Sequence, residues 1–223
     1  MGRYMSNEHK MAFIMCVNDP QAEAEAKYYI SRLMIPDGMI VEFQSIYDAK
    51  SMTEGYNRAM KNTDAKYKVY MHQDVMIINE NFISDILCIF KDARIGMVGM
   101  VGTPKLPENG IMWLGDRVGG LYTHNYSYTR KVIMDNASEG MIFSAEAIDG
   151  FLMATQYDIP WREDVFTGWD YYDVSQSFEF RKAGYMVAVP YCDPPWCMHD
   201  DGGQNLENYF MTRKTFLREY RNI

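Results

Sequence analysis

The stretch Lys66-Tyr67-Lys68-Val69-Tyr70-Met71-His72-Gln73-Asp74-Val75 places a short apolar strand directly before a polar cluster that ends in a carboxylate. The chain turns polar again at Asn79-Glu80-Asn81. Ligands of an open α/β sheet bind just beyond the carboxyl ends of its strands, so an Asp at this place can reach a ligand or a metal ion. Asp also ends strands for turn chemistry alone. The rest of the chain has to decide between these two interpretations.

Composition indicates one large domain with enough apolar residues for a core. The chain has 223 residues, of which 48% are hydrophobic and 14% aromatic. Its formal net charge of −8 argues against a nucleic-acid partner, whereas a single nucleotide can be held by backbone amides and a cation. Residues 1–10 lack the apolar core of a secretory signal, and no run approaches the roughly 18 apolar residues of a membrane span.

The first hundred residues alternate buried strands with amphipathic helices. Strands are predicted at Met11–Val17, Met39–Phe43, Tyr67–Met71 and Ile95–Val101. Helices are predicted from Pro20, from Met52 to about Lys61, and from Phe82 to Phe90. Because such alternation requires crossover connections, we expect an α/β fold with a mostly parallel central sheet flanked by helices.

Capping signals indicate where two of these helices begin. Asp19 can cap a helix whose first residue is Pro20. Ser51-Met52-Thr53-Glu54 is a capping box, in which the Ser hydroxyl and the Glu carboxylate satisfy the first free amides of the helix reciprocally.

The pattern changes after residue 102. Thr103 to Arg130 is rich in Gly, Pro and aromatic residues, and we expect an excursion of short strands there, with Met112-Trp113-Leu114 among them. Further elements are predicted as a strand at Ala147–Thr155, a helix at Val174–Ala183 ended by Gly184, a last strand at Tyr185–Pro190 and a helix from Asn205 to Tyr220. No linker divides the chain, which predicts a single domain over residues 1–223.

Polar clusters follow several of the predicted strands. They are Asn18-Asp19, Asp48, His72-Gln73-Asp74 and His199-Asp200-Asp201, the last placed after the final strand. A turn or a cap explains each cluster alone, but their recurrence at strand ends favours one shared site. Asp74 and His199 offer the oxygen and imidazole ligands that suit Mn²⁺ or Mg²⁺, although one Asp alone would hold the ion weakly.

The four cysteines are scattered through the chain. Cys192 and Cys197, with His199 nearby, match no strong zinc spacing, so we predict no structural zinc. Cys16 and Cys88 lie in apolar surroundings, where buried thiols are common. A reduced, cytoplasmic protein is the simplest expectation.

A further acidic cluster lies among aromatic residues at Trp169-Asp170-Tyr171-Tyr172-Asp173. Asp173 stands where a helix is predicted to begin, and an N-cap role alone would explain an Asp there. The neighbouring aromatic side chains suggest instead a pocket wall, where partial desolvation raises the basicity of a carboxylate. Both interpretations remain open from the residues alone.

Motifs in a fixed order give a resemblance over nearly the whole chain. They are residues 51–57, His72-Gln73-Asp74-Val75, residues 149–155, residues 168–174 and residues 199–203. The set resembles a family of bacterial glycosyltransferase-like proteins related to the family-2 glycosyltransferases, whose fold is called GT-A. The resemblance implies a Rossmann-like GT-A fold, with a nucleotide-binding half at about 11–102 and an acceptor half at about 103–223.

The resemblance also implies roles for individual residues. Donor binding would fall to Val17, Asn18, Asp48, Asn57, His72, Gln73 and Asp74. The acceptor or sugar side would comprise Asp149, Gly150, Trp169 and Asp170. Asp74 and His199 would hold Mn²⁺ or Mg²⁺, and Asp173 would be the catalytic base. The chain departs from the wider family, which has a second acid at the metal where His72 and Gln73 stand, and often consecutive acids where Tyr172 precedes Asp173.

The activity implied is inverting, metal-assisted transfer of a sugar from a nucleotide-diphosphate sugar, expected to be a uridine nucleotide, to an acceptor hydroxyl. The acceptor would be a saccharide or lipid-linked saccharide of surface-polysaccharide synthesis, which would place the protein at the inner membrane face without a span. Two alternatives remain. A nucleotidyltransferase would need a glycine-rich, basic loop, which Asn18-Asp19-Pro20 does not offer. A non-catalytic nucleotide-sugar-binding protein would explain the single Asp74.

Overall fold

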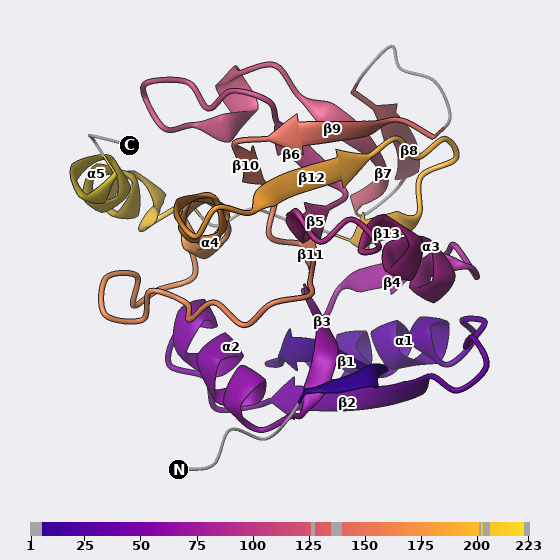
Figure 1. Ribbon diagram of the computed structural model, residues 1–223. Coiled ribbons are helices and arrows are strands. Elements are labelled where there is room, and N and C mark those ends of the chain that lie inside the picture. Colours follow the sequence, from indigo (N-terminus) through magenta and orange to yellow (C-terminus); the bar gives the residue numbers. More distant parts are fainter. Residues whose placement is uncertain (1–5, 126–127, 135–139, 201, 203–205, 221–223) are drawn as a thin grey trace.

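A seven-stranded sheet runs through the centre of the protein in the order β2-β1-β3-β11-β5-β12-β9 (Figure 1). The computed structural model describes residues 6–125, 128–134, 140–200, 202 and 206–220. The strands of this sheet are β1 (Asn7–Cys16), β2 (Ile40–Ile46), β3 (Ala65–Met71), β5 (Ile95–Gly99), β9 (Ile142–Ala145), β11 (Leu152–Thr155) and β12 (Met186–Pro190).

The predicted α/β fold is confirmed, and the sheet is mixed. β1 pairs in parallel with β2 and β3, and β12 pairs in parallel with β5. β11 lies antiparallel between β3 and β5, and β9 lies antiparallel to β12. The alternation of strands and helices predicts the crossovers of the first half, but it carries no sign of a later strand that inserts between β3 and β5.

Helices cover both faces of the central sheet (Figure 1). One face packs against α1 (Pro20–Ile30) and α3 (Phe82–Ile89), and the other against α2 (Met52–Lys61) and α4 (Tyr172–Lys182). The sequence of β1 is apolar without alternation because both faces of the strand are buried. Its odd-numbered residues Met11, Phe13 and Met15 lie in one core cluster, and its even-numbered residues Ala12 and Ile14 lie in the other.

The helix starts follow the capping signals. The carboxylate of Asp19 accepts hydrogen bonds of 2.8 and 3.3 Å from the amides of Gln21 and Ala22. At α2, the hydroxyl of Ser51 accepts a 3.1 Å bond from the amide of Glu54. The Glu54 carboxylate accepts a hydrogen bond from the backbone amide of Lys50. In the expected capping box it would accept from the amide of Ser51, so the observed partner lies one residue earlier in the chain.

A second sheet carries part of the excursion, in the order β10-β6-β7-β13-β4, with β8 paired to β7. Its strands are β4 (Val75–Ile77), β6 (Val101–Thr103), β7 (Val118–Asn125), β8 (Tyr128–Ile133), β10 (Ala147–Ile148) and β13 (Cys197–Asp200). The strand predicted at Ile95–Val101 is divided at Met100 between the two sheets, and the strand predicted at Ala147–Thr155 is divided at residues 149–151.

Three predictions about the second half were wrong in detail. Met112–Leu114 is a short 3₁₀ helix (η1) and not a strand. The last strand is β13 and not the predicted Tyr185–Pro190, because β13 pairs with β4, a strand of three residues that was not predicted. The last helix, α5 (Tyr209–Glu219), begins later than the predicted Asn205, which lies outside the described residues together with Asp201 and Gly203.

The C-terminal helix is held against α4 by aromatic side chains. Phe178 of α4 lies 5.3 Å, between ring centroids, from both Phe216 and Tyr220.

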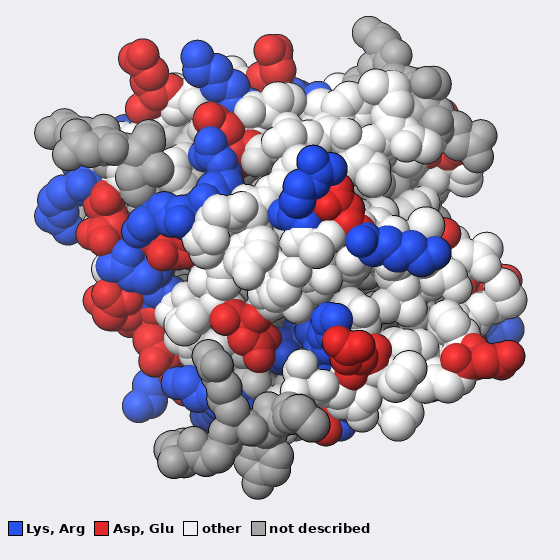
Figure 2. Space-filling model, viewed as in Figure 1, with Lys and Arg blue, Asp and Glu red and all other residues white. Residues whose placement is uncertain are grey.

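None of the helices in the described part of the chain combines the length and the apolar character needed to cross a bilayer. Figure 2 shows basic and acidic side chains intermingled over one face of the molecule.

Candidate active site

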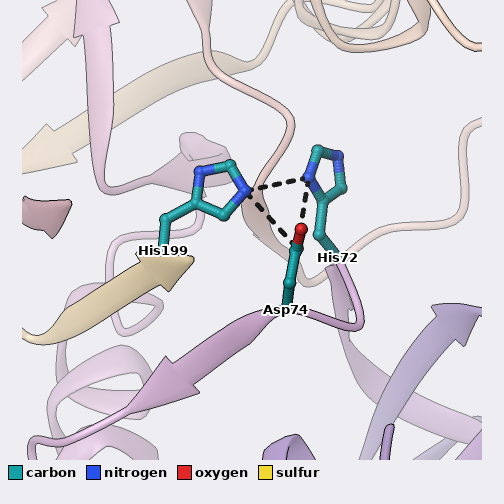
Figure 3. A group of neighbouring side chains, drawn as sticks. All are labelled: His72, Asp74 and His199. Atoms are coloured by element: carbon teal, nitrogen blue, oxygen red, sulfur yellow. Dashed lines mark hydrogen bonds and ion pairs between the residues drawn. The ribbon is translucent and has the colours of Figure 1, made fainter. Parts of the chain in front are cut away.

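Side chains of three residues converge where β3 leads into β4 (Figure 3). Nε2 of His199 lies 3.4 Å from Nδ1 of His72 and 3.4 Å from Oδ1 of Asp74. Nδ1 of His72 lies 3.9 Å from the same Asp74 oxygen. All three ligand-type atoms fall within 4.8 Å of one another, which is the arrangement of a metal-ligand group.

Strand pairing brings these residues together from distant parts of the chain. β13 runs antiparallel to β4, which sets His199 opposite Val75. The amide of Asp200 donates a 3.0 Å bond to the carbonyl of Asp74 and extends this pairing to the site. His199 therefore lies within a strand, and not after the last strand as its sequence position indicated. The expected metal pair of Asp74 and His199 is assembled, with His72 as a third member.

The chemistry of this group fits a divalent cation. Oδ1 of Asp74 is buried, and among the described residues its polar neighbours are the imidazole nitrogens of His199 and His72, at 3.4 and 3.9 Å. Burial opposes its ionisation, yet the neighbouring His199 and His72 hold the pKa of the Asp74 carboxyl below its ordinary value. Burial, reinforced by His199, lowers the pKa of His72 to about 4, so its ring is neutral at pH 7. A carboxylate with two imidazoles is a ligand set that suits Mn²⁺.

A pocket of about 260 Å³ opens beside the metal-ligand group. Of the expected site residues, its wall contains Val17, Asn18, His72, Gln73, Asp74 and Trp169. Gln73 shapes this wall because its Oε1 accepts hydrogen bonds of 2.9 Å from the amides of both Asn18 and Asp19. No Lys or Arg is among the described residues that line the pocket.

Two expected donor residues do not line this pocket. Asp48 is exposed and pairs with Arg58 at 2.6 Å. Asn57 is buried, and its side-chain amide makes hydrogen bonds of 2.9 Å in both directions with the backbone of Trp161. That pairing ties α2 to the segment before α4, which is a structural reason for an Asn at this place.

Tyr47 is a pocket residue that sequence reasoning missed. Tyr47 is 63% exposed, and its hydroxyl donates a 3.0 Å hydrogen bond to the carboxylate of Glu23. This bond fixes the position of the ring. Trp169, 52% exposed, lines the same pocket. Tyr47 directly follows the second strand of the sheet, and that position was the signal that could have identified it.

Asp173 lies in the first turn of α4 and is not its N-cap, which is Tyr171. Its Oδ1 accepts a 2.8 Å bond from the amide of Val174, and its Oδ2 accepts a 2.9 Å bond from the amide of Gly150. Burial, with a contribution from the Asp149 charge, raises the pKa of the Asp173 carboxyl to about 7. A carboxyl with this pKa can take up a proton near neutral pH.

Two of the expected acceptor-side residues interact with Asp173, namely Asp149 through its charge and Gly150 through its amide. Asp149 accepts a 3.1 Å bond from the amide of Phe151 and shapes the turn between β10 and β11. Burial raises the pKa of the Asp170 carboxyl. Tyr172 joins the two parts of the site, because its hydroxyl lies 2.5 Å from Nε2 of His72. Sequence pattern indicated Tyr172 as part of an aromatic pocket wall and as a departure from consecutive acids, but it did not indicate the contact with His72.

Comparison with known proteins agrees with this architecture. Residues 12–220 match the model of a family described as "Glycosyltransferase like family". No curated protein matches the chain in sequence. Among solved structures, a mannosyltransferase from Pyrobaculum calidifontis, in complex with GDP-Man and Mn²⁺, superposes with a TM-score of 0.61 at 11% identity over 99% of this chain and 66% of its own.

Other solved structures are equally distant in sequence. GalNAc-T7, with UDP, GalNAc and Mn²⁺, gives a TM-score of 0.60 at 9% identity, covering 98% of this chain and 50% of that one. TarS from S. aureus gives 0.60 at 9% identity, covering 96% and 40%. At such identities these likenesses show the fold, which is GT-A. The chain spans less than two thirds of TarS and of GalNAc-T7, and about two thirds of the mannosyltransferase.

Proposed function

The chain belongs to the glycosyltransferase-like family whose model spans residues 12–220, and from that membership we propose that it transfers a sugar from a nucleotide-diphosphate sugar to an acceptor hydroxyl. The observation that carries the proposal is the convergence of His72, Asp74 and His199 beside a pocket, together with the contact of His72 with Tyr172, the residue next to Asp173.

The donor's diphosphate would lie against the metal-ligand group. No Lys or Arg side chain is among the described residues that line the pocket, so this lining supplies no basic side chain to balance the diphosphate. His72, Asp74 and His199 would hold Mn²⁺ or Mg²⁺ there, and such an ion supplies charge stabilisation for the departing diphosphate. Mn²⁺ is favoured because it accepts imidazole ligands more readily than Mg²⁺ does.

Asp173 would act as the base. Its carboxylate takes the proton of the acceptor hydroxyl, the hydroxyl oxygen forms a bond to the anomeric carbon, and the bond from that carbon to the phosphate oxygen breaks with its electron pair leaving on the diphosphate. The configuration inverts in a single displacement of this kind. Support comes from the raised pKa of Asp173 and from the two backbone amides that fix its carboxylate.

The nucleobase would lie between Tyr47 and Trp169. Both rings are more than half exposed and line the same pocket, and an exposed ring offers a face on which a base can stack. We place Trp169 on the donor side for this reason. A uridine nucleotide remains the expected donor, and the solved relatives include one with UDP and one with GDP-Man.

The acceptor we propose is a saccharide or lipid-linked saccharide of a bacterial surface polysaccharide, reached from the cytoplasmic side. The support is the family relationship together with four free cysteines, which fit a reducing compartment. The main alternative, a non-catalytic nucleotide-sugar-binding protein, drew on the single Asp74. His72 and His199 lie beside that Asp and could hold a metal ion with it, which weakens that support.

One experiment separates these functions. The protein is screened by thermal shift against UDP-sugars and GDP-mannose with and without Mn²⁺, and each ligand that stabilises it is then assayed for hydrolysis of the donor. A transferase should be stabilised by one donor more strongly when Mn²⁺ is present than when it is absent, and it should release the nucleoside diphosphate slowly. Stabilisation without any turnover, with or without saccharide acceptors, would support the binding protein instead.

A further inference from the structure

The two ring nitrogens of His72 face different partners. Nδ1 points into the metal-ligand group, where it lies 3.4 Å from Nε2 of His199 (Figure 3). Nε2, on the opposite side of the ring, lies 2.5 Å from the hydroxyl of Tyr172. The backbone amide of His72 is fixed as well, by a 2.9 Å bond to the carbonyl of Phe151. The ring is therefore held from the backbone and at both nitrogens.

A neutral imidazole carries one N–H and one lone pair, and only the lone pair can bind a metal ion. For Nδ1 of His72 to act as a ligand, the proton has to be on Nε2. In that tautomer Nε2–H donates to the Tyr172 oxygen. A partner for the second ring N–H is what usually fixes the tautomer and the ring orientation of a metal-binding histidine. Tyr172 is placed to be that partner.

The surroundings of Tyr172 hold its hydroxyl in this position. The side chain is 4% exposed and packs against Tyr56 and Trp161, with centroid distances of 6.0 and 6.3 Å. Gly150 leaves the space that the hydroxyl occupies, because a Cβ at position 150 would overlap it. The preceding residue, Tyr171, has φ = 61°, an uncommon conformation for a residue with a side chain.

We propose that Tyr172 is a positioning residue that keeps His72 in its metal-ligating tautomer, an inference that rests on the proposed metal-assisted function. Because Asp173 follows Tyr172 in the same helical turn, one turn of α4 then sets both the metal ligand and the base. A turn that moved would displace both groups together. The hydroxyl of Tyr172, and not its ring, carries this role.

Tyr172→Phe tests the proposal because it removes the hydroxyl and keeps the ring. Mn²⁺ alone is titrated into metal-free protein, and the free ion is followed by electron paramagnetic resonance. Loss of such an outer partner typically costs about 10- to 100-fold in metal affinity, and we expect a loss in this range. Tyr56→Phe is the matched control, since its buried hydroxyl bonds only weakly, at 3.4 Å, to the carbonyl of Met71. It should leave Mn²⁺ affinity unchanged.

Nitrogen NMR on the wild-type protein gives a readout that needs no variant. The chain has four histidines, and the ring signals of His72 should show the proton on Nε2. A proton on Nδ1 would overturn the inference directly. So would an unchanged Mn²⁺ affinity in Tyr172→Phe when the wild type binds the ion, and neither result would touch the transferase proposal. Failure of the wild type to bind Mn²⁺, alone or with UDP or GDP, would overturn the metal-assisted function as well.

Discussion

The backbone amide of Gly150 donates a 2.9 Å hydrogen bond to Oδ2 of Asp173. This bond joins the turn between β10 and β11 to the first turn of α4, so the carboxylate is fixed from outside its own helix. Each oxygen of Asp173 accepts one amide hydrogen and retains capacity for a further proton. Position and proton capacity are the two properties that a general base needs.

Asp173→Asn should abolish most transfer without unfolding the protein. Asn keeps the shape of the side chain and one acceptor oxygen but cannot take up the proton. Loss of a general base typically costs about 10² to 10⁴ in rate, and we expect at least a hundredfold loss with donor binding retained. Asp164→Asn, which removes an exposed carboxylate paired with Arg162, is the control and should keep full activity. A wild-type transfer rate in Asp173→Asn would contradict this role and would make Asp170 the next candidate for the base.

The pH dependence of transfer should report the same group. The pKa of Asp173 is raised to about 7 by burial and by Asp149, and only the ionised form accepts a proton. The transfer rate should therefore rise as the pH increases through about 7 and then level off. The residual activity of Asp173→Asn should lack this rise when the two profiles are measured side by side. A wild-type rate that is flat from pH 5 to 9 would contradict the assignment.

Asp74→Asn should weaken metal-dependent donor binding. The change removes the only carboxylate of the metal-ligand group while keeping its shape. Loss of a side chain that hydrogen-bonds to a metal ligand typically costs about 10- to 100-fold in metal affinity. Loss of the ligand itself should cost at least as much. Calorimetric titration with UDP or GDP and Mn²⁺ measures the effect. Asp64→Asn, at a surface pair with Lys10, is the charge-matched control, and equal affinities in both variants would remove Asp74 from the site.

Gly150→Ala should destabilise the protein, because the new Cβ would overlap the Tyr172 hydroxyl. Overpacking of this kind typically costs about 1–3 kcal/mol, which denaturant unfolding can resolve. Gly168→Ala is the control, since a Cβ there meets nothing within 4 Å. Mn²⁺ affinity should fall in Gly150→Ala as well, because the displaced hydroxyl no longer meets His72. Equal stability of the two variants would show that Tyr172 can move freely.

Tyr47→Ala should weaken nucleotide binding in the absence of any metal. Stacking of a base on an aromatic ring is worth about 1–3 kcal/mol, so affinity for UMP or GMP should fall about fivefold or more. Quenching of Trp169 fluorescence by the nucleotide gives the measurement. Tyr28→Ala, at a ring that is 55% exposed on α1 and outside the pocket, should have no effect. Equal loss in both variants would argue against a stacking role.

The sequence predicts the first half of the fold well because its signals there are local. The apolar run at Met11–Val17, the Asp19 cap and the Ser51 box each depend on neighbouring residues, and each element appears where it is expected. The elements that were missed, β4 of the first half among them, depend on pairing between distant segments. β4 and β13 are short, and each is recognisable as a strand only because the other lies beside it.

The residues of the candidate site also differ in whether local sequence could indicate them. Asp74 and Asp173 could be selected as candidates from their places after a strand and before a helix, and the contact of His72 with Tyr172 connects the segments that carry them. The role of His72 as a third ligand could not be selected, because it depends on which ring nitrogen faces His199. Tyr172 was invisible for a similar reason, since its contact with His72 spans 100 positions of the chain.

β11 has a consequence for how the chain folds during its synthesis. The strand fills the gap between β3 and β5, and it consists of residues 152–155. In a nascent chain that has emerged only as far as residue 102, the edges of β3 and β5 that later pair with β11 would both be unpaired. Pairings of such long sequence separation form slowly. The order of translation thus leaves β3 and β5 without their shared partner until the segment that also carries Asp149 and Gly150 has left the ribosome, and β12 and α4 can join the core only after that.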